Sequence, residues 1–328
     1  MSLGLSWVPG LLGCLIARER LPRRRSPLNG YKKNIRTYLR LVRLPALFTA
    51  AGDPLAGYFL ALPAGAAPEP ANLAGAILAG VFLYAAGMAA NDVADRERDR
   101  IHKPDRPIPA GEIPVGRAAV LAGILAALGL ASAALAGPVA LALGSILAIA
   151  VAAYDFALKR NAVAGAVGMG FCRAANLCLG LAAGGLAAGD FPDRLPAAPA
   201  FLFGYVAVLS LASGFEDRPA TRGRVALLGL SHLGVLVAAA VSFENPAGWV
   251  PLGLLAGLLV WAYLRLARRP SAALAGTLVR TGVVGILLLD AAFLAGSGRH
   301  EAVALALGFL AAGAAWWRVA SVSGVKGE

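Results

Sequence analysis

The chain has 328 residues, of which 59% are hydrophobic and only 15% charged, and its mean hydropathy is +0.70. A soluble domain carries about 25% charged residues, so this composition excludes an ordinary soluble protein and indicates that lipid surrounds most of the chain. The net charge of +12 does not predict a nucleic-acid partner, because the basic residues lie in short segments between long apolar runs, where they suit anionic membrane lipids.

The N-terminal segment is basic and differs from a signal peptide. An apolar run over 3–16 is followed by Arg18, Arg20, Arg23, Arg24 and Arg25. A signal peptide has its charges before the apolar part, and this run is too short to span a bilayer. We predict a basic extension over 1–40, either interfacial or disordered, a transmembrane domain over 41–318 and a cytosolic tail over 319–328.

Ten apolar segments long enough to cross a membrane follow one another along the chain. They cover 44–62, 72–91, 118–136, 138–156, 163–187, 198–215, 224–243, 247–267, 273–296 and 300–317. Gly137-Pro138 and Asn245-Pro246 predict tight turns, because proline disfavours helix in the residue before it. The predicted fold is therefore all-α, a polytopic transmembrane bundle of about ten spans.

The basic residues predict the orientation of these spans. With the N-terminus inside, the inner segments hold 26 of the 30 lysines and arginines, and the outer loops hold two, Arg194 and Arg299. The positive-inside rule then places the N-terminus and the aspartate-rich loops in the cytosol. We expect a multi-pass protein of a bacterial inner membrane.

The first acidic motif ends the second span. It reads Asn91-Asp92-Val93-Ala94-Asp95-Arg96-Glu97-Arg98-Asp99, and the i, i+3, i+7 spacing of its aspartates places them on one face of a helix. Three like charges on one face repel unless a cation neutralises them, and carboxylates suit Mg²⁺ or Mn²⁺ bridging to substrate phosphates. The alternative is a solvated loop in which neighbouring arginines pair with the acids.

The next residues decide between these interpretations. His102-Lys103-Pro104-Asp105-Arg106-Pro107-Ile108-Pro109-Ala110-Gly111 follows directly. The order NDxxDxxxD and then RPxPxG resembles the UbiA superfamily of intramembrane prenyltransferases, from about Leu41 to about Leu294. The resemblance implies a bundle of usually nine spans, whose central cavity opens to the cytosolic acidic loops and sideways to lipid.

The second acidic motif of the family is degenerate in this chain. Its position is held by Ser213-Gly214-Phe215-Glu216-Asp217-Arg218-Pro219-Ala220-Thr221. The resemblance implies that Glu216 or Asp217 assists a second metal ion on the diphosphate. Adjacent helical residues point about 100° apart, so we expect one of these acids to face Asp92 and Asp95 and the other to pair with Arg218 or Arg222.

Basic and polar residues complete the predicted substrate site. The segment Tyr154-Asp155-Phe156-Ala157-Leu158-Lys159-Arg160 resembles a family segment whose cations face the diphosphate, and Arg43 resembles an arginine that opens the first span. The alternatives are snorkelling at a helix end for the former and a topology charge for Arg43.

Polar residues also occur inside the spans. Arg173 and Asn176 share one face of the fifth span, and Asp53 lies in the first. Ionisable residues in a membrane core generally face an interior cavity. A structural ion pair between Asp53 and Arg173 is the alternative, and His232 is expected to be a hydrogen-bonded helix contact.

These predictions favour a metal-dependent transferase. A prenyl diphosphate would bind through Mg²⁺ at Asp92, Asp95 and Asp99, with Glu216 or Asp217 assisting. Its prenyl group would pass within the membrane to an unidentified acceptor of aromatic or lipophilic character. The substrate-binding residues would be Asn91, Arg43, Arg106, Tyr154, Lys159, Arg160, Arg173, Asn176 and Asp53. A non-catalytic isoprenoid-binding protein is the alternative, which the weak second motif favours. An ion-coupled transporter would not explain the acids beside RPxPxG.

Overall fold

The computed structural model describes residues 35–186, 197–217 and 219–322, with side chains as far as 316. In this part of the chain the regular structure is helical throughout. The long helices are α2 (Leu44–Ala61), α3 (Pro70–Ala94), α5 (Val115–Leu135), α6 (Pro138–Phe156), α7 (Ala162–Ala183), α9 (Ala198–Ser213), α10 (Arg222–Val241), α11 (Trp249–Arg268), α12 (Ala272–Gly296) and α13 (His300–Val322). Short helices are α4 (Arg96–His102), η1 (Leu158–Arg160) and η3 (Pro246–Gly248).

The all-α prediction is therefore confirmed, and each predicted span corresponds to one long helix within a few residues. Seven of the described helices are long and apolar enough to cross a membrane, and the protein is a multi-span membrane bundle. Residues 1–34 of the predicted basic extension over 1–40, and the last residues, 323–328, lie outside the described residues.

The helix boundaries follow from local sequence signals. Proline occupies the first turn of α2, α3, α6 and α9, where its missing N–H costs no hydrogen bond. The predicted turn at Gly137 is confirmed, because this residue adopts φ +118°, a conformation that L side chains avoid. Asn161 caps α7 by accepting hydrogen bonds from two backbone N–H groups.

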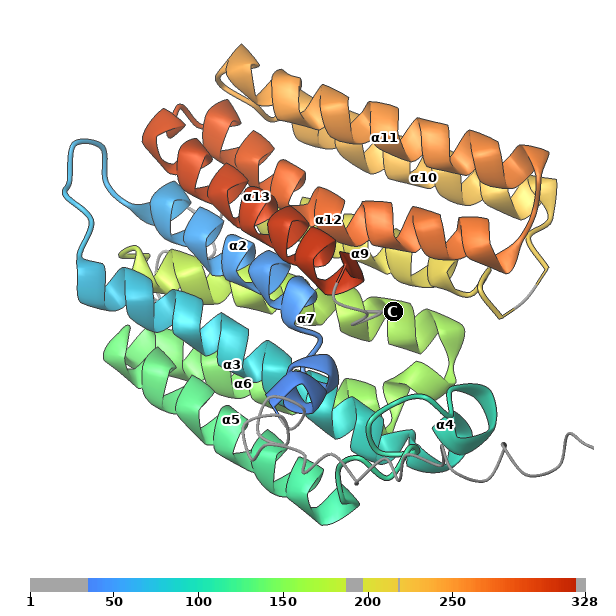
Figure 1. Ribbon diagram of the computed structural model, residues 1–328. Helices are drawn as coiled ribbons and strands as arrows, with labels where there is room; N and C mark the ends of the chain where they lie inside the picture. The colour runs from blue at the N-terminus through green and yellow to red at the C-terminus, as the bar shows by residue number, and fades with distance from the viewer. Residues whose placement is uncertain (1–34, 187–196, 218, 323–328) are drawn as a thin grey trace, which may run out of the picture. The chain divides into compact units, whose positions relative to one another are not determined.

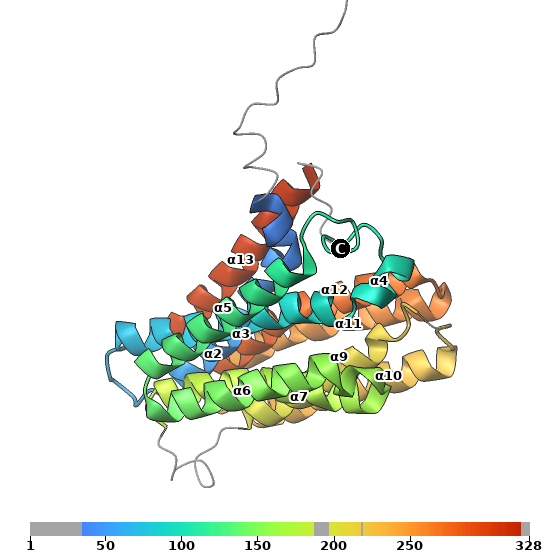
Figure 2. The ribbon, with the colours of Figure 1, turned by 90° about the horizontal axis from the view of Figure 1, so that it is seen from below.

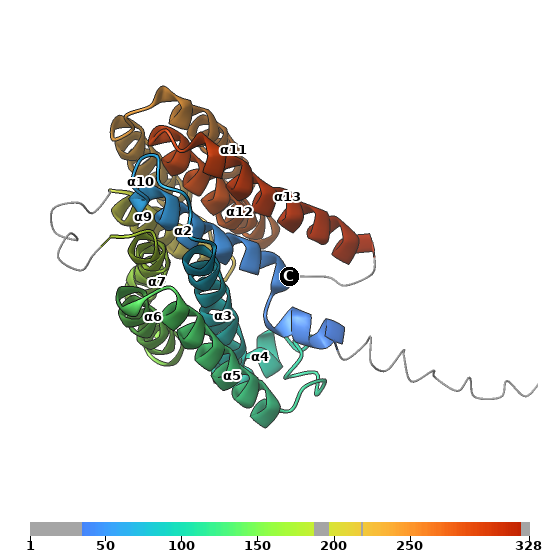
Figure 3. The same cartoon turned by 90° about the vertical axis from the view of Figure 1, so that its left-hand side faces the viewer.

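The long helices form two groups joined by α2 and α7. Helices α3, α5 and α6 pack on one side, and α9 to α12 pack on the other (Figures 1 and 3). Helix α7 contacts α6, α9 and α2, whereas α2 contacts α3, α7, α12 and α13. Side chains of α12 and α7 are mostly buried, whereas only 22% of the residues in the apolar windows of α5, α6 and α10 are buried, as expected for interior and lipid-facing helices.

The backbones of α2 and α7 touch because glycine removes the side chains between them. A Cβ atom at Gly180 would lie 2.2 Å from the carbonyl oxygen of Pro54, and one at Gly184 would lie 2.2 Å from that of Tyr58. Gly57 approaches the carbonyl oxygen of Leu177 in the same way, from the opposite helix. Small residues four apart allow close helix contact in membranes, where apolar surface alone does not drive association.

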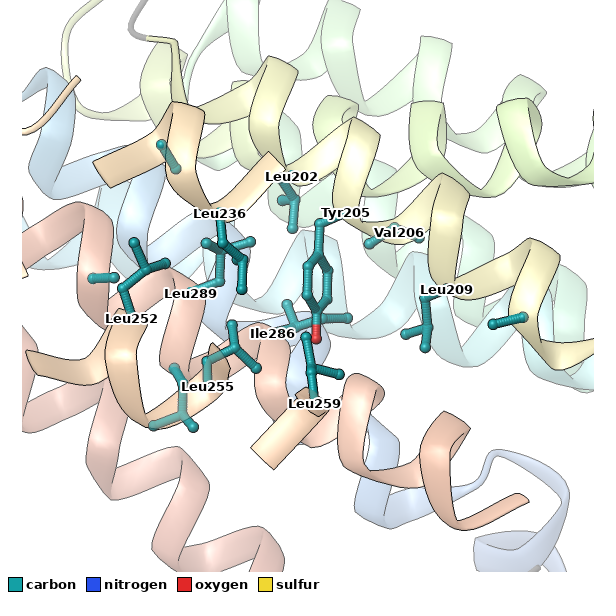
Figure 4. Packing of buried hydrophobic residues seen from close by; sticks show 14 of the residues in the cluster. Leu202, Tyr205, Val206, Leu209, Leu236, Leu252, Leu255, Leu259, Ile286 and Leu289 are labelled. Carbon is teal, nitrogen blue, oxygen red and sulfur yellow. The ribbon is translucent and has the colours of Figure 1, made fainter. Parts of the chain in front are cut away.

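The core of the second group surrounds a hydrogen-bonded aromatic cluster. Tyr205 of α9 lies among leucines of α10, α11 and α12 (Figure 4), and its hydroxyl donates to the carbonyl oxygen of Gly282 at 2.8 Å. One ring nitrogen of His232 lies 2.6 Å from the hydroxyl of Tyr263, and the other lies 3.0 Å from the carbonyl oxygen of Tyr205. The prediction that His232 is a structural helix contact is confirmed.

Substitution of Gly180 by alanine should destabilise the bundle. The added methyl group would overlap the backbone of α2, so we expect a loss of about 1–3 kcal/mol, seen as a lower Tm in detergent. Gly253→Ala is the matched control, because a Cβ atom there meets nothing within 4 Å. A Gly180→Ala protein as stable as the control would contradict the close contact of α2 and α7.

Candidate active site

The three aspartates of the first motif gather at one end of the bundle, although the helix does not continue through them. Helix α3 ends at Ala94, Asp95 adopts φ −91° and ψ 3°, and α4 begins at Arg96. Asp92 and Asp99 are buried. One Arg106 nitrogen, Nη1, lies 3.3 Å from Asp92 Oδ1 and 2.5 Å from Asp99 Oδ2, and so joins these two carboxylates.

The loop after α4 places Arg106 against the acids. Its backbone turns back on itself, because the N–H groups of Glu112 and Ile113 both donate to the carbonyl oxygen of Pro107. Gly111 adopts φ +70°, which favours glycine. Arg40 donates to Glu112 and to the carbonyl oxygen of Asp105, which anchors the loop to the segment before α2.

Lys159 forms an ion pair with Asp95, the remaining aspartate of the motif. Its Nζ atom lies 2.9 Å from Asp95 and donates to the side-chain oxygen of Asn91 at 2.8 Å. Lys159 lies in η1, directly after α6, so this contact brings the fourth span to the first acidic motif. The structure does not bring Arg160 there: its side chain is exposed, and it makes no ion pair with the described residues.

Arg43 stands between the two acidic motifs. Its Nη2 atom lies 3.6 Å from Asp92 Oδ1, and its charge also acts on Glu216. Among the described residues it is the one non-glycine with a positive φ, 51°. Such a backbone conformation costs of order 1–3 kcal/mol and occurs most often at functional sites. This strain fits a role for Arg43 beyond topology.

The second motif contributes less to this cluster than the first. Asp217 pairs with Arg98 of α4 at 3.1 Å, and both side chains are largely exposed. The expected partner was Arg218 or Arg222. The described residues show no ion pair with Arg222, and Arg218 lies outside them, so this expectation stays a prediction. The pair nevertheless confirms that the two acidic loops lie at the same end of the bundle.

Glu216 is the acid of the second motif that lies among cations. A Cβ atom at Gly276 would lie 3.6 Å from Oε1 of Glu216 and 3.5 Å from Nη1 of Arg280. Partial burial raises the pKa of Glu216 above its ordinary value, which the charges of Lys103, Arg280 and Arg43 oppose. Arg280 of α12 and Lys103 of the first loop were not predicted as site residues.

The donor groups suit a hard divalent cation. Asp92, Asp95 and Asp99 offer only carboxylate oxygens, the ligands that Mg²⁺ prefers. Within the described residues these oxygens face arginine and lysine, and no three acidic, histidine or cysteine side chains converge on one point. The carboxylates are therefore of the type that binds Mg²⁺. A bound Mg²⁺ would replace the arginine and lysine side chains as their partner.

A second polar cluster lies inside the membrane part of the bundle. Arg173 Nη2 donates to Asp53 Oδ1 at 3.0 Å, and Asn176 Nδ2 donates to Asp53 Oδ2 at 2.9 Å. The pairing of Asp53 with Arg173, the alternative to a substrate-binding role, is present, and the role of these residues in substrate binding stays a prediction. Asp290 of α12 is fully buried beside this cluster, and both of its carboxylate oxygens lack hydrogen-bond partners among the described residues.

A narrow cavity of about 50 Å³ lies between α3, α6 and α7. Tyr154, Asp155, Arg173 and Asn176 line it, together with Gly80, Tyr84, Gly87, Met88, Leu147, Val151, Met169 and Cys172. Asp155 is buried and was not predicted as a site residue. The sequence contained a signal that could have identified Asp155. It is a carboxylate at the end of an apolar span, and ionisable residues in such spans are generally functional.

Known proteins agree with this architecture. The model of the UbiA prenyltransferase family matches residues 53–281. A digeranylgeranylglyceryl phosphate synthase of Ignicoccus hospitalis is 30% identical over 232 residues, which cover 70% of this chain and 72% of that protein. A protein of the same name from Methanoculleus marisnigri is 33% identical over 153 residues, 47% of this chain and about half, 53%, of the relative.

A solved structure has the same fold. It is a UbiA homolog from Archaeoglobus fulgidus bound to GPP and Mg²⁺, and it is 18% identical, with a TM-score of 0.54. The alignment covers 78% of this chain and 99% of that structure.

The two motifs should differ in their effect on ligand binding. We expect Asp92→Asn or Asp95→Asn to weaken Mg²⁺-dependent binding of a prenyl diphosphate at least tenfold, because these acids lie at the centre of the cation cluster. Asp217→Asn should change it less than threefold, because an exposed ion pair is worth at most about 1 kcal/mol. Calorimetry with and without EDTA measures both. Equal effects at Asp92 and Asp217 would contradict this ranking.

Proposed function

Because the chain belongs to the UbiA prenyltransferase family, we propose that it transfers a geranylgeranyl group from its diphosphate to the hydroxyl of a glyceryl phosphate that already carries one such chain. The name of the similar synthases supports this acceptor, since their product carries two geranylgeranyl groups on one glyceryl phosphate. The allylic C–O bond to diphosphate would break, a C–O bond to the acceptor oxygen would form, and the hydroxyl would release its proton. An aromatic acceptor has less support.

The charge arrangement at Asp92, Asp95 and Asp99 is the observation on which this proposal rests. These residues would hold Mg²⁺, which would neutralise charge on the leaving diphosphate. Arg106 and Lys159 already lie at the same carboxylates, so a metal ion there would free them to donate to phosphate oxygens. Guanidinium groups bind such oxygens through two hydrogen bonds. Arg43 and Glu216 would border the diphosphate on its other side.

The interactions in this cluster would act mainly in the transition state. Negative charge on the diphosphate grows as the allylic bond breaks, so fixed cations stabilise this state more than the bound substrate. The low-dielectric surroundings of the membrane helices strengthen this stabilisation and exclude water from the carbocation.

A non-catalytic isoprenoid-binding protein is the second candidate. The position of Asp217 favours it, because this acid turns to Arg98 at the surface and leaves Glu216 as the one acid of the second motif among the cations of the site. Against it stands the retention of three aspartates with Arg106, Lys159 and Arg43, since simple binding of an isoprenoid does not need them.

A direct assay separates these functions. Purified protein with Mg²⁺, geranylgeranyl diphosphate and geranylgeranylglyceryl phosphate should release diphosphate and form the doubly prenylated product, and EDTA should abolish both. 4-Hydroxybenzoate in place of the lipid acceptor tests the aromatic class. Binding of geranylgeranyl diphosphate without product from either acceptor would support the binding protein instead.

We propose further that the acidic end of the bundle faces the cytosol. The division of lysine and arginine, 26 against two, supports this orientation. At the opposite end, Arg299 donates to the carbonyl oxygen of Leu62 and is held in the bundle surface. The similar synthases are archaeal, so a plasma membrane of either prokaryotic domain suits the chain.

Labelling of single cysteines tests the orientation. A protein without its three native cysteines should react with a membrane-impermeant maleimide at Glu112→Cys only from the cytosolic side. Ala66→Cys, in the exposed turn between α2 and α3, should react only from the outside. The reverse result would exclude the proposed orientation.

A further inference from the structure

The cavity between α3, α6 and α7 contains polar atoms without partners. Among the described residues, five buried side-chain polar atoms lack a hydrogen-bond partner, and three of these belong to residues that line this cavity: Asp155 Oδ2, Arg173 Nε and Asn176 Oδ1. Each of the three residues is at least 96% buried. A buried polar atom without a partner is unfavourable, so the arrangement suits a bound polar group that completes it.

The orientation of Asn176 is fixed by its neighbours. Its nitrogen donates to the carbonyl oxygen of Ala50 and to Asp53, so its oxygen is the atom left over. Arg173 similarly uses Nη2 for Thr49 and Asp53, and its Nε–H group is buried without a partner among the described residues. The buried unpartnered atoms of the lining residues are therefore one donor, from Arg173, and two acceptors, from Asn176 and Asp155.

This set of atoms selects the chemistry of the ligand. A prenyl chain offers neither donor nor acceptor, and a diphosphate offers acceptors only and would meet the Asp155 carboxylate. A hydroxyl group both donates and accepts, so it can donate to Asp155 or Asn176 and accept from Arg173. The volume also fits, since about 10–15 Å³ of such space holds one water molecule and this cavity has about 50 Å³.

The cavity extends from the acidic end of the bundle into its interior. Its lining on α6 runs from Asp155 to Leu147, eight residues or about 12 Å of helix. At the end near the acidic motif, the charge of Asp155 interacts with Lys159 and Asp95. Arg173 and Asn176 lie at the other end, in the interior of the bundle. A small group in the cavity would therefore lie next to the carbon that leaves the diphosphate.

We propose that this cavity binds the free hydroxyl group of the prenyl acceptor, with Asp155 as its hydrogen-bond acceptor at the end near the acidic motif, Arg173 and Asn176 as the polar groups at the other end, and the acceptor's phosphate, which Asp155 would repel, outside the cavity. The proposal rests on the proposed function and adds the place and the residues of the acceptor site. It explains why an acid stands at 155, inside an apolar helix face, without a hydrogen-bond partner for Oδ2.

Direct binding tests the proposal without requiring turnover. Two probes are compared by calorimetry in detergent: geranylgeranylglyceryl phosphate, and an analogue in which hydrogen replaces its free hydroxyl. A site that hydrogen-bonds a hydroxyl discriminates strongly against a ligand that lacks it. Wild-type protein should bind the first probe at least tenfold more tightly, and Asp155→Leu should reduce this ratio to less than about threefold.

Control variants separate this effect from general damage. Ile149→Ala, on the exposed face of the same helix, should keep the wild-type ratio, and the Tm of each variant reports folding. If Asp155→Leu does not fold, Asp155→Asn serves, with a smaller expected loss, because its amide keeps one acceptor. Mg²⁺-dependent binding of geranylgeranyl diphosphate should stay within threefold of wild type in both Asp155 variants.

Three outcomes would overturn the proposal. The wild type could bind both probes equally, which would mean that the cavity holds water only. A folded Asp155→Leu protein could keep the full ratio. Asp155→Leu could also lower diphosphate and acceptor binding alike, which would assign Asp155 to the metal cluster. Failure of the proposed function looks different, because product would then be absent although the hydroxyl-dependent binding ratio persists.

Discussion

The contact between α2 and α7 is the constraint on which the site depends. Gly57, Gly180 and Gly184 bring the two backbones together, and this approach places Asp53 of α2 beside Arg173 and Asn176 of α7. A buried charge is tolerated only when it is paired and hydrogen-bonded. The glycines therefore permit the polar cluster, and the cluster in turn fixes the rotation of both helices, so that the face of α7 with Arg173 lines the cavity.

The charges at the end of the bundle form a balanced set. Asp92, Asp95 and Asp99 are paired with Arg106, Lys159 and Arg43, which come from three different parts of the chain. Such a cluster stays folded without a metal ion, because each carboxylate has a protein cation. It can also take up a metal–diphosphate complex by exchange of partners, since the anionic diphosphate offers the displaced cations new oxygen atoms.

The fold separates the two kinds of polar group by depth. The groups that suit a diphosphate lie at the helix ends, near α4 and the loop after it, which stand at one end of the bundle (Figure 2). The groups that suit a hydroxyl lie within the helices, lining a narrow cavity. The degenerate second motif belongs to the first of these places, because Asp217 pairs with Arg98 of α4. A loss of acids there affects the charge cluster at the helix ends and leaves the cavity unchanged.

The sequence by itself determined the membrane fold, the ten helices and the identity of the main acidic motif, because hydropathy and the NDxxDxxxD and RPxPxG patterns are local signals. It also predicted the Asp53–Arg173 pair and the structural role of His232, since charges and polar rings inside spans need partners. It did not identify Asp155, Lys103 or Arg280 as site residues, nor Arg98 as a partner of Asp217. These contacts form between side chains of α3, α4, α6, α7 and α12, which are far apart in the chain. Only tertiary packing, set by the glycine contact between α2 and α7 and by the buried ion pair, brings these side chains together.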